Sequence, residues 1–170
     1  MTGGPILVVG DVIRDVVATI SDSIRPDTDA SANITFRSGG SAANTAVWLG
    51  HLGTPVDFVG RVGVGDLKDL QSEFSDYGVR AHLDEDLELP TGAIVVIVQS
   101  ESRSMLSDRG ANLNLRFDNI RAELLSAASW LHLTGYSCFH QRTSDPVSNL
   151  IGVAQEMNTK VFLDASSSGF

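Results

Sequence analysis

Four short apolar runs recur along the chain, and each ends at a glycine or an aspartate. Runs that are apolar at consecutive positions are typical of strands buried on both faces of a sheet. The segments between them carry helical periodicity, so the pattern predicts an α/β domain with a parallel sheet and right-handed crossovers. The four runs are ILVVG at 6–10, VDFVG at 56–60, WLHLTG at 130–135 and KVFLD at 160–164.

Apolar periodicity predicts four helices between or after these strands. The first is apolar nearly all round and stops at Gly53 and Pro55, which favours a buried helix. Aspartate precedes the other three, as expected for residues near a helix N-terminus. The predicted helices cover residues 43–52, 67–77, 120–128 and 147–154.

Three further segments have the alternating, β-rich pattern of exposed strands. They are DVVATISD at 15–22, SANITFRS at 31–38 and GAIVVIVQSESRSMLSD at 92–108. They predict a small antiparallel sheet inserted into the α/β domain around 15–38 and 92–108. Such a flap suits a lid, because closing over a substrate excludes water from a transfer reaction. An edge extension of the main sheet is the alternative.

Composition fits a single domain with its own core, since the 170 residues are 42% hydrophobic. Cys138 has no partner for a disulfide, and no basic leader or long apolar run opens the chain, so a soluble, cytoplasmic protein is expected. A net charge of −9 without a Lys/Arg cluster disfavours nucleic-acid binding. The four histidines show no metal-ligand spacing, so no metal site is expected.

The glycine-rich stretch GGSAA at 39–43 approximates the nucleophile elbow of a hydrolase, with Ser41 as the nucleophile. Ala43 stands where that motif has its last glycine. His140 and Asp164 follow in the order Ser, His, Asp, which is not the order of that hydrolase fold. A hydrolase is therefore disfavoured.

A second glycine-rich stretch, VGRVGVGD at 59–66, suggests a dinucleotide site with Asp84 as the ribose ligand. The order of its glycines, at 60, 63 and 65, is the reverse of the dinucleotide fingerprint. The stretch also does not follow the first strand, where that fingerprint belongs. Glycines that let the backbone turn tightly are the preferred interpretation.

A substrate cradle is the third hypothesis. Gly39 and Gly40 bring backbone N–H groups close to a ligand, and Ser41 can cap the helix that follows. Asn44, one turn into the helix, offers both a donor and an acceptor. Asp15 lies just past the first strand and can hold two hydroxyls of a polyol.

Six segments, in order and spacing, resemble the N-terminal half of the ribokinase-like (PfkB) sugar kinases. The resemblance covers essentially the whole chain and is most specific from Gly39 through Asn44 to Gly53. It implies a three-layer, Rossmann-like α/β fold, present here in part, with a β-sheet lid. The segments are GDVIRDVV, GGSAANTAVWLGHLG, VGRVGVGD, SDRGANLNL, LHLTGYSCF and VFLDASSS.

The resemblance also implies roles for individual residues. Asp15 is similar to the aspartate at the family's lid hinge that binds sugar hydroxyls. Gly39, Gly40 and Asn44 match its substrate-binding glycines and asparagine. Two further residues, Arg109 and Asn112, lie where some members contact the substrate. Tyr136 and Asp164, near strand ends, are weaker candidates to line the pocket.

No part of the sequence matches the family's second signature, Asp-Thr-x-Gly-Ala-Gly-Asp, which holds the catalytic base and the anion hole. In this family, ATP binding also belongs to the half that carries the second signature. Residues 1–170 are therefore expected to form the sugar-binding part of an ATP- and Mg²⁺-dependent sugar kinase, with no catalytic residue and almost no activity alone. A non-catalytic sugar-binding or regulatory protein and a nucleoside kinase relative remain alternatives, and a homodimer through the lid is expected.

Overall fold

A computed structural model describes residues 3–21, 23–138 and 145–166 of the chain. Its main sheet is entirely parallel, with the strand order β5-β4-β1-β8-β9. The predicted parallel α/β domain is confirmed. The five strands are β1 (Ile6–Val9), β4 (Val56–Gly63), β5 (Val79–Asp86), β8 (Trp130–Thr134) and β9 (Lys160–Asp164).

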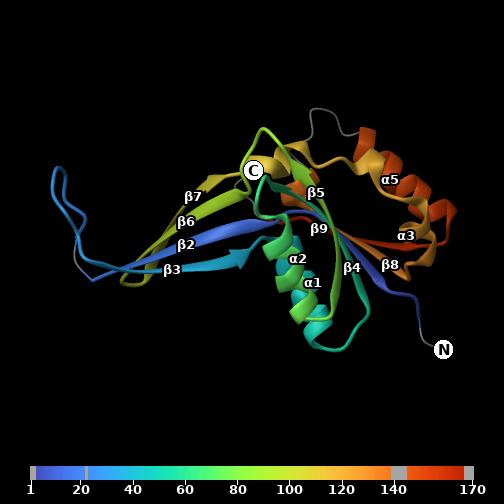
Figure 1. Cartoon of the computed structure of the whole chain (residues 1–170), viewed down its shortest axis with the longest axis horizontal. Coiled ribbons are helices and arrows are strands. Elements are labelled where there is room, and N and C mark those ends of the chain that lie inside the picture. Colours follow the sequence, from blue (N-terminus) through green and yellow to red (C-terminus); the bar gives the residue numbers. More distant parts are fainter. Residues whose placement is uncertain (1–2, 22, 139–144, 167–170) are drawn as a thin grey trace.

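Helices cover both faces of this sheet, so the body has three layers (Figure 1). On one face lie α1 (Ser41–His51) and α2 (Leu67–Asp76), and on the other lie α3 (Ala122–Ala127) and α5 (Asp145–Glu156). Short helical turns form η1 (Gly110–Asn114), η2 (Phe117–Asn119) and α4 (Gly135–Cys138).

Successive side chains of the central strand β1 enter the two cores alternately. Leu7 and Val9, both fully buried, pack among residues of α3 and α5. Val8, also fully buried, packs among residues of α1 and α2. Phe58 of β4 extends this second core and stacks on Phe74 of α2 with ring centroids 4.6 Å apart. A strand buried on both faces explains why its sequence is apolar at every position.

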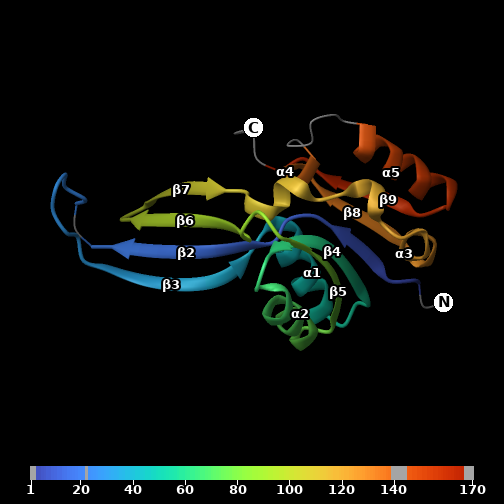
Figure 2. The ribbon, with the colours of Figure 1, turned by 45° about the horizontal axis from the view of Figure 1, so that its top comes forward.

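The predicted lid is a separate four-stranded sheet that extends away from the body (Figures 1 and 2). Its order is β3-β2-β6-β7, from β2 (Ile13–Ile20), β3 (Ala32–Gly39), β6 (Gly92–Gln99) and β7 (Ser102–Asp108). The two outer pairings are antiparallel, as predicted, but the central pairing of β2 with β6 is parallel. The sheet is mixed because β2 and β6 both leave the body in the same direction.

Two elements differ from the sequence-based expectation. Strand β5, with the sequence VRAHLDED, was not predicted because it is an edge strand and carries polar side chains. The helix expected over 120–128 is shorter, since Ile120 and Arg121 are extended and α3 occupies only Ala122–Ala127. Neither difference alters the layer order.

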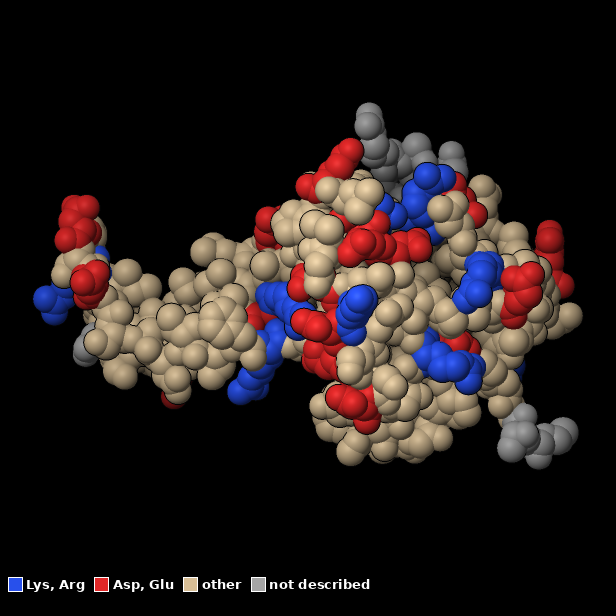
Figure 3. Space-filling view, viewed as in Figure 1, with Lys and Arg blue, Asp and Glu red and all other residues tan. Residues whose placement is uncertain are grey.

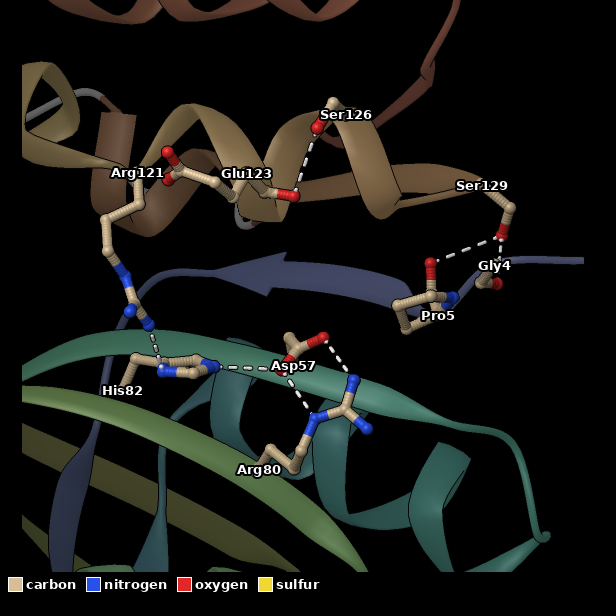
Figure 4. A network of polar contacts seen from close by, with 9 residues as sticks. All are labelled: Gly4, Pro5, Asp57, Arg80, His82, Arg121, Glu123, Ser126 and Ser129. Carbon is tan, nitrogen blue, oxygen red and sulfur yellow. Dashed lines mark hydrogen bonds and ion pairs between the residues drawn. The ribbon is translucent and has the colours of Figure 1, made fainter.

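A buried carboxylate, Asp57 on β4, holds β5 in place (Figure 4). Arg80 donates to its two oxygens at 2.9 and 2.6 Å, and His82 Nε2 donates at 2.8 Å. Arg121 Nη2 donates to His82 Nδ1 at 2.7 Å, which assigns the remaining ring proton to Nε2. Burial alone would raise the pKa of Asp57, but the bonds from Arg80 and His82 outweigh burial and lower that pKa. This carboxylate is satisfied internally, so its role is structural.

The glycine in the last turn of α1 gives a test of the packing. A Cβ on Gly50 would meet the Tyr77 carbonyl oxygen and, at 2.8 Å, a Val79 methyl group. We expect Gly50→Ala to lower the free energy of unfolding by about 1–3 kcal/mol, because backbone must shift. Gly152→Ala, in α5 with no atom within 4 Å of the new Cβ, is the control and should raise it by about 0.5–1 kcal/mol. Urea unfolding measures both, and equal effects would contradict the packing described.

Candidate substrate-binding site

A cavity of about 360 Å³ lies between the lid and the carboxyl ends of the main-sheet strands. This end of a parallel sheet is where open α/β folds bind ligands. The lid contributes a row formed by Asp15, Ile94 and Ser107 and a second row formed by Val96 and Met105. The full lining is Asp11, Asp15, Gly40, Ser41, Asn44, Ile94, Val96, Met105, Ser107, Arg109 and Tyr136.

Asp15 is a carboxylate of this cavity whose charge is not balanced by a hydrogen bond or an ion pair from the described residues. It is half-buried on β2, and no hydrogen bond or ion pair reaches its carboxylate from the rest of the described chain. Burial raises its pKa, and the nearby charge of Asp11 raises that pKa further. A desolvated carboxylate in a cavity is a candidate for ligand binding, because a ligand can supply the missing hydrogen bonds.

Gly39 and Gly40 make room for the two carboxylates. A Cβ on Gly39 would collide with the side chain of Asp15, and a Cβ on Gly40 would collide with the backbone of Asp11. Gly40 also has a φ of 102°, in the region that favours glycine. Gly40 lines the main cavity, whereas Gly39 lines a smaller neighbouring cavity of about 170 Å³ between the lid base, α1 and α2.

Asp11 is the site residue that the sequence-based reasoning missed. Its side chain, 3% exposed, accepts hydrogen bonds from the backbone N–H groups of Ser41 at 2.8 Å and Ala42 at 3.2 Å. The Thr134 hydroxyl donates a third at 3.2 Å. The predicted cap by Ser41 is therefore replaced, since Gly40 is the N-cap and Asp11 satisfies the helix. The signal was an aspartate directly after the first strand, in GDVIRD.

Asn44, predicted as a donor and acceptor, is exposed one turn into α1 and lines both cavities. The structure brings it together with Asp15 and Gly40. Arg109 also lines the main cavity, where its guanidinium carbon lies 5.1 Å from the ring centroid of Tyr136. This cation–π contact forms a wall beside the carboxylates.

Asn112 does not reach the cavity. It is 8% exposed, and its amide is bonded to backbone at the base of the lid. Its oxygen accepts from the N–H of Val12 at 2.9 Å, and its nitrogen donates to the Val12 and Arg109 carbonyls at 2.8 and 2.9 Å. Asn112 thus fixes the hinge rather than presenting a free group to a ligand.

The other sequence hypotheses find no support in the geometry. Asp164 is outside the cavity lining and accepts from the backbone of Ser166 at 2.9 Å. His140 lies outside the described residues. Gly63, of the dinucleotide hypothesis, packs against the backbone of Pro90 and Thr91. Within residues 3–21, 23–138 and 145–166, no group of three acidic, histidine or cysteine side chains is placed to hold a metal, and no helix has the length and apolarity to cross a membrane.

Comparison with known proteins agrees with this architecture. The sequence pattern described as pfkB family carbohydrate kinase matches residues 5–169. The chain belongs to this family. Among curated proteins, adenosine kinase from Dictyostelium discoideum is 27% identical over 114 residues, which are 62% of this chain and 34% of that protein.

Solved structures of similar fold include two ribokinases and a fructokinase. Ribokinase from Giardia lamblia gives a TM-score of 0.81 at 19% identity, covering 99% of this chain and 52% of its own. Arabidopsis thaliana ribokinase, solved with ribose and ATP, gives a TM-score of 0.78 at 24% identity, covering 97% of this chain and 54% of its own. Fructokinase from Xylella fastidiosa, with bound ATP, gives a TM-score of 0.81 at 22% identity, covering 97% of this chain and 52% of its own. The chain therefore spans about half the length of these structures.

The triphosphate of ATP does not fit the helix N-terminus at this PfkB cavity. An exposed helix start is an anion site because its N–H groups are unpaired. Here Asp11 already accepts from Ser41 and Ala42, and Asp15 adds a second carboxylate to the same cavity. A phosphate placed there would be repelled by both.

The uncompensated carboxylate predicts an unusual stability change. The pKa of Asp15 is higher in the folded protein than its ordinary value of 3.8, so the ionised side chain lowers the stability of the fold at neutral pH. This destabilisation disappears as the pH falls through the folded-state pKa, because the side chain becomes protonated in both states. We expect Asp15→Asn to be more stable than the parent at neutral pH, with the difference shrinking near pH 4. Urea unfolding at both pH values measures this. Asp69→Asn, an exposed change of equal charge on α2, is the control, and a destabilised Asp15→Asn would contradict the prediction.

Proposed function

We propose that this chain is the sugar-binding half of a PfkB kinase that transfers a phosphate from ATP-Mg²⁺ to a sugar hydroxyl. The observation that carries the proposal is Asp15, a desolvated carboxylate without a partner among the described residues, in one cavity with Asn44 and Gly40. Hydroxyl groups donate to carboxylates, so a polyol supplies what Asp15 lacks. The family match over residues 5–169 supports a kinase.

The lid supplies the second part of the proposed function. Ile94, Val96 and Met105 present an apolar surface to the cavity from β6 and β7. When such a surface approaches a bound sugar, it displaces water from the hydroxyls and strengthens their bonds to Asp15. The same exclusion of water protects a phosphoryl group from hydrolysis during transfer.

ATP and Mg²⁺ are proposed for the complete family fold and not for these 170 residues. The sequence has no match to Asp-Thr-x-Gly-Ala-Gly-Asp, and the helix start at the cavity is occupied by Asp11. Phosphoryl transfer depends on positioning both reactants and stabilising the moving charge. We therefore expect the 170-residue chain to bind its acceptor substrate without consuming ATP.

A nucleoside is the second candidate acceptor, and the composition of the cavity favours considering it. Besides Asp15 and Asn44, the cavity is lined by three apolar side chains of the lid, Ile94, Val96 and Met105, against which a flat, apolar base can pack. The curated relative named above is an adenosine kinase. Adenosine keeps the hydroxyls of ribose except the anomeric one, which the base replaces, so both acceptors can donate to Asp15.

A homodimer through the outer face of the lid is also proposed. Side chains opposite Asp15 form an apolar row across all four strands, namely Phe36, Val16, Val95 and Leu106. Phe36 is 79% and Leu106 62% exposed, and the sheet extends beyond the body, so a second copy can cover this face. The single cysteine supports a cytoplasmic setting, and the net charge of −9 disfavours a nucleic-acid partner. On the face drawn in Figure 3, basic side chains are interspersed with acidic ones.

Calorimetric titration of the 170-residue chain with ribose, fructose and adenosine tests the substrate proposal. Asp15→Asn should weaken binding by roughly 10-fold to 100-fold, because hydrogen bonds to a charged group contribute about 1.5–3 kcal/mol. Asp69→Asn is the control and should bind as the parent does. Met105→Ala separates the two acceptor classes, since it removes apolar contact with the base and should weaken binding of adenosine more than binding of ribose.

Two outcomes would contradict this proposal. Binding that is insensitive to Asp15→Asn would place the ligand elsewhere. The expected loss of binding would not reflect unfolding, because that variant is expected to be more stable than the parent. Sugar-dependent ATP consumption by the 170 residues alone would overturn the assignment of catalysis to the rest of the family fold.

Sedimentation velocity over a range of concentrations tests the dimer. The parent chain should self-associate, and Phe36→Ser should be monomeric because it replaces the most exposed large side chain of the apolar row, at its β3 end, with a hydroxyl. Leu52→Ser, which removes a 73% exposed leucine just after α1, is the matched control and should leave association unchanged. A parent chain that is monomeric at every concentration would refute the proposed interface.

A further inference from the structure

Four polar side chains connect the lid to α2 on the side of β2 that faces away from Asp15. Arg14 Nη1 donates to Ser38 Oγ at 3.0 Å, and Ser38 Oγ donates to Glu73 Oε2 at 2.6 Å. The Arg14 guanidinium also lies 3.6 Å from Glu73 and 3.6 Å from Asp66. Figure 3 shows basic and acidic side chains together where the lid meets the body. We refer to Arg14, Ser38, Asp66 and Glu73 as the latch.

The Ser38 hydroxyl sets the direction of these bonds. A guanidinium only donates and a carboxylate only accepts, so the hydroxyl must accept from Arg14 and donate to Glu73. The hydrogen bond from the charged Arg14 polarises the Ser38 hydroxyl, which then donates more strongly to the charged Glu73. The short bond from Ser38 to Glu73 is therefore the strongest contact of the latch. Loss of the Ser38 hydroxyl therefore removes both hydrogen bonds and leaves only the two longer ion pairs of Arg14 between the lid and α2.

The latch is attached to the substrate cavity through two adjacent pairs of residues. Arg14 precedes Asp15 on β2, and the two side chains leave the strand on opposite faces. Ser38 precedes Gly39 on β3, directly before the Gly40 that begins α1. Arg14 and Ser38 are cross-strand partners, so the latch holds β2 and β3 at the same pair of the ladder.

We propose that Arg14, Ser38 and Glu73 are positioning residues that fix the lid on α2 and so hold Asp15 in place over the cavity. The part of this inference that concerns substrate rests on the proposed function, whereas the part that concerns lid position does not. Arg14 and Glu73 are 36% and 41% exposed, so each ion pair contributes only ~0.2–1 kcal/mol. A latch of this strength biases the lid toward one position and still releases it for closure.

Distances between spin labels on lid and body test the latch in the full chain. Cysteines replace Ser104 on β7 and Gln155 on α5, both exposed, in a Cys138→Ala background. Ser38→Ala and Glu73→Gln should each broaden the distance distribution and shift the ratio of lid positions on the order of threefold. The double variant should shift it by less than the sum of the two single shifts, because both changes remove the bond between Ser38 and Glu73.

Two controls separate the latch from a general loss of structure. Ser38→Thr keeps the hydroxyl and should restore the parent distribution, and Asp69→Asn removes an α2 charge outside the latch and should leave it unchanged. A parent-like distribution in both Ser38→Ala and Glu73→Gln would overturn the proposal, as would equal broadening by Asp69→Asn.

The substrate half of the inference has its own readout. Ser38→Ala should weaken binding of the acceptor found by calorimetry by on the order of threefold, and Ser38→Thr should restore it. Unchanged binding together with a shifted lid would overturn the link to Asp15. If none of the sugars or adenosine binds, the proposed function fails while the label distances still decide whether the latch exists.

Discussion

The carboxylate of Asp11 lies at the N-terminus of α1, 3% exposed, and accepts from two helix N–H groups and from Thr134. Burying a charge is costly unless it is paired, and here three donors and the positive end of the helix compensate it. The bonds join the end of β1, the start of α1 and the end of β8. Those three elements form the floor of the cavity, so its geometry depends on this contact.

This arrangement determines which ligands the cavity accepts. A helix start normally attracts anions, but here its N–H groups are already paired with Asp11. The fixed charge of Asp11 also contributes to the raised pKa of Asp15. Two carboxylates in one cavity repel phosphates and carboxylates and favour donors, and neutral hydroxyls are donors that need no counter-charge. The proposal of a polyol as the ligand therefore rests on how α1 is capped.

Much of the fold was predictable because burial on two faces leaves an unmistakable pattern. β1, β8 and β9 were predicted within one residue, and the lid was recognised from its alternating sequence. β5 was missed because an edge strand with the sequence VRAHLDED has no such pattern. The parallel pairing of β2 with β6 was also unpredictable, since alternation does not record strand direction.

The position of a candidate site residue was predictable where the residue acts on its own, and its contacts were not predictable where distant partners decide them. Asp15, Gly40 and Asn44 were expected together and do line one cavity. Asn112 was expected to contact substrate, yet its amide is bonded to the backbone of Val12, 100 residues away in sequence. Asp11 was missed for the same reason, because its donors come from α1 and β8 and only folding brings them to it.

The hinge of the lid combines a fixed point with a movable one. Asn112 holds both backbone groups of Val12 and is buried, so this side of the hinge resists separation. The latch, by contrast, is partly exposed and individually weak. A sheet anchored firmly at Val12 and loosely at Arg14 is free to rotate about its base while its register is preserved. Such a rotation would move Asp15, the first cavity residue beyond the fixed point, so the proposed latch acts on the proposed substrate contact.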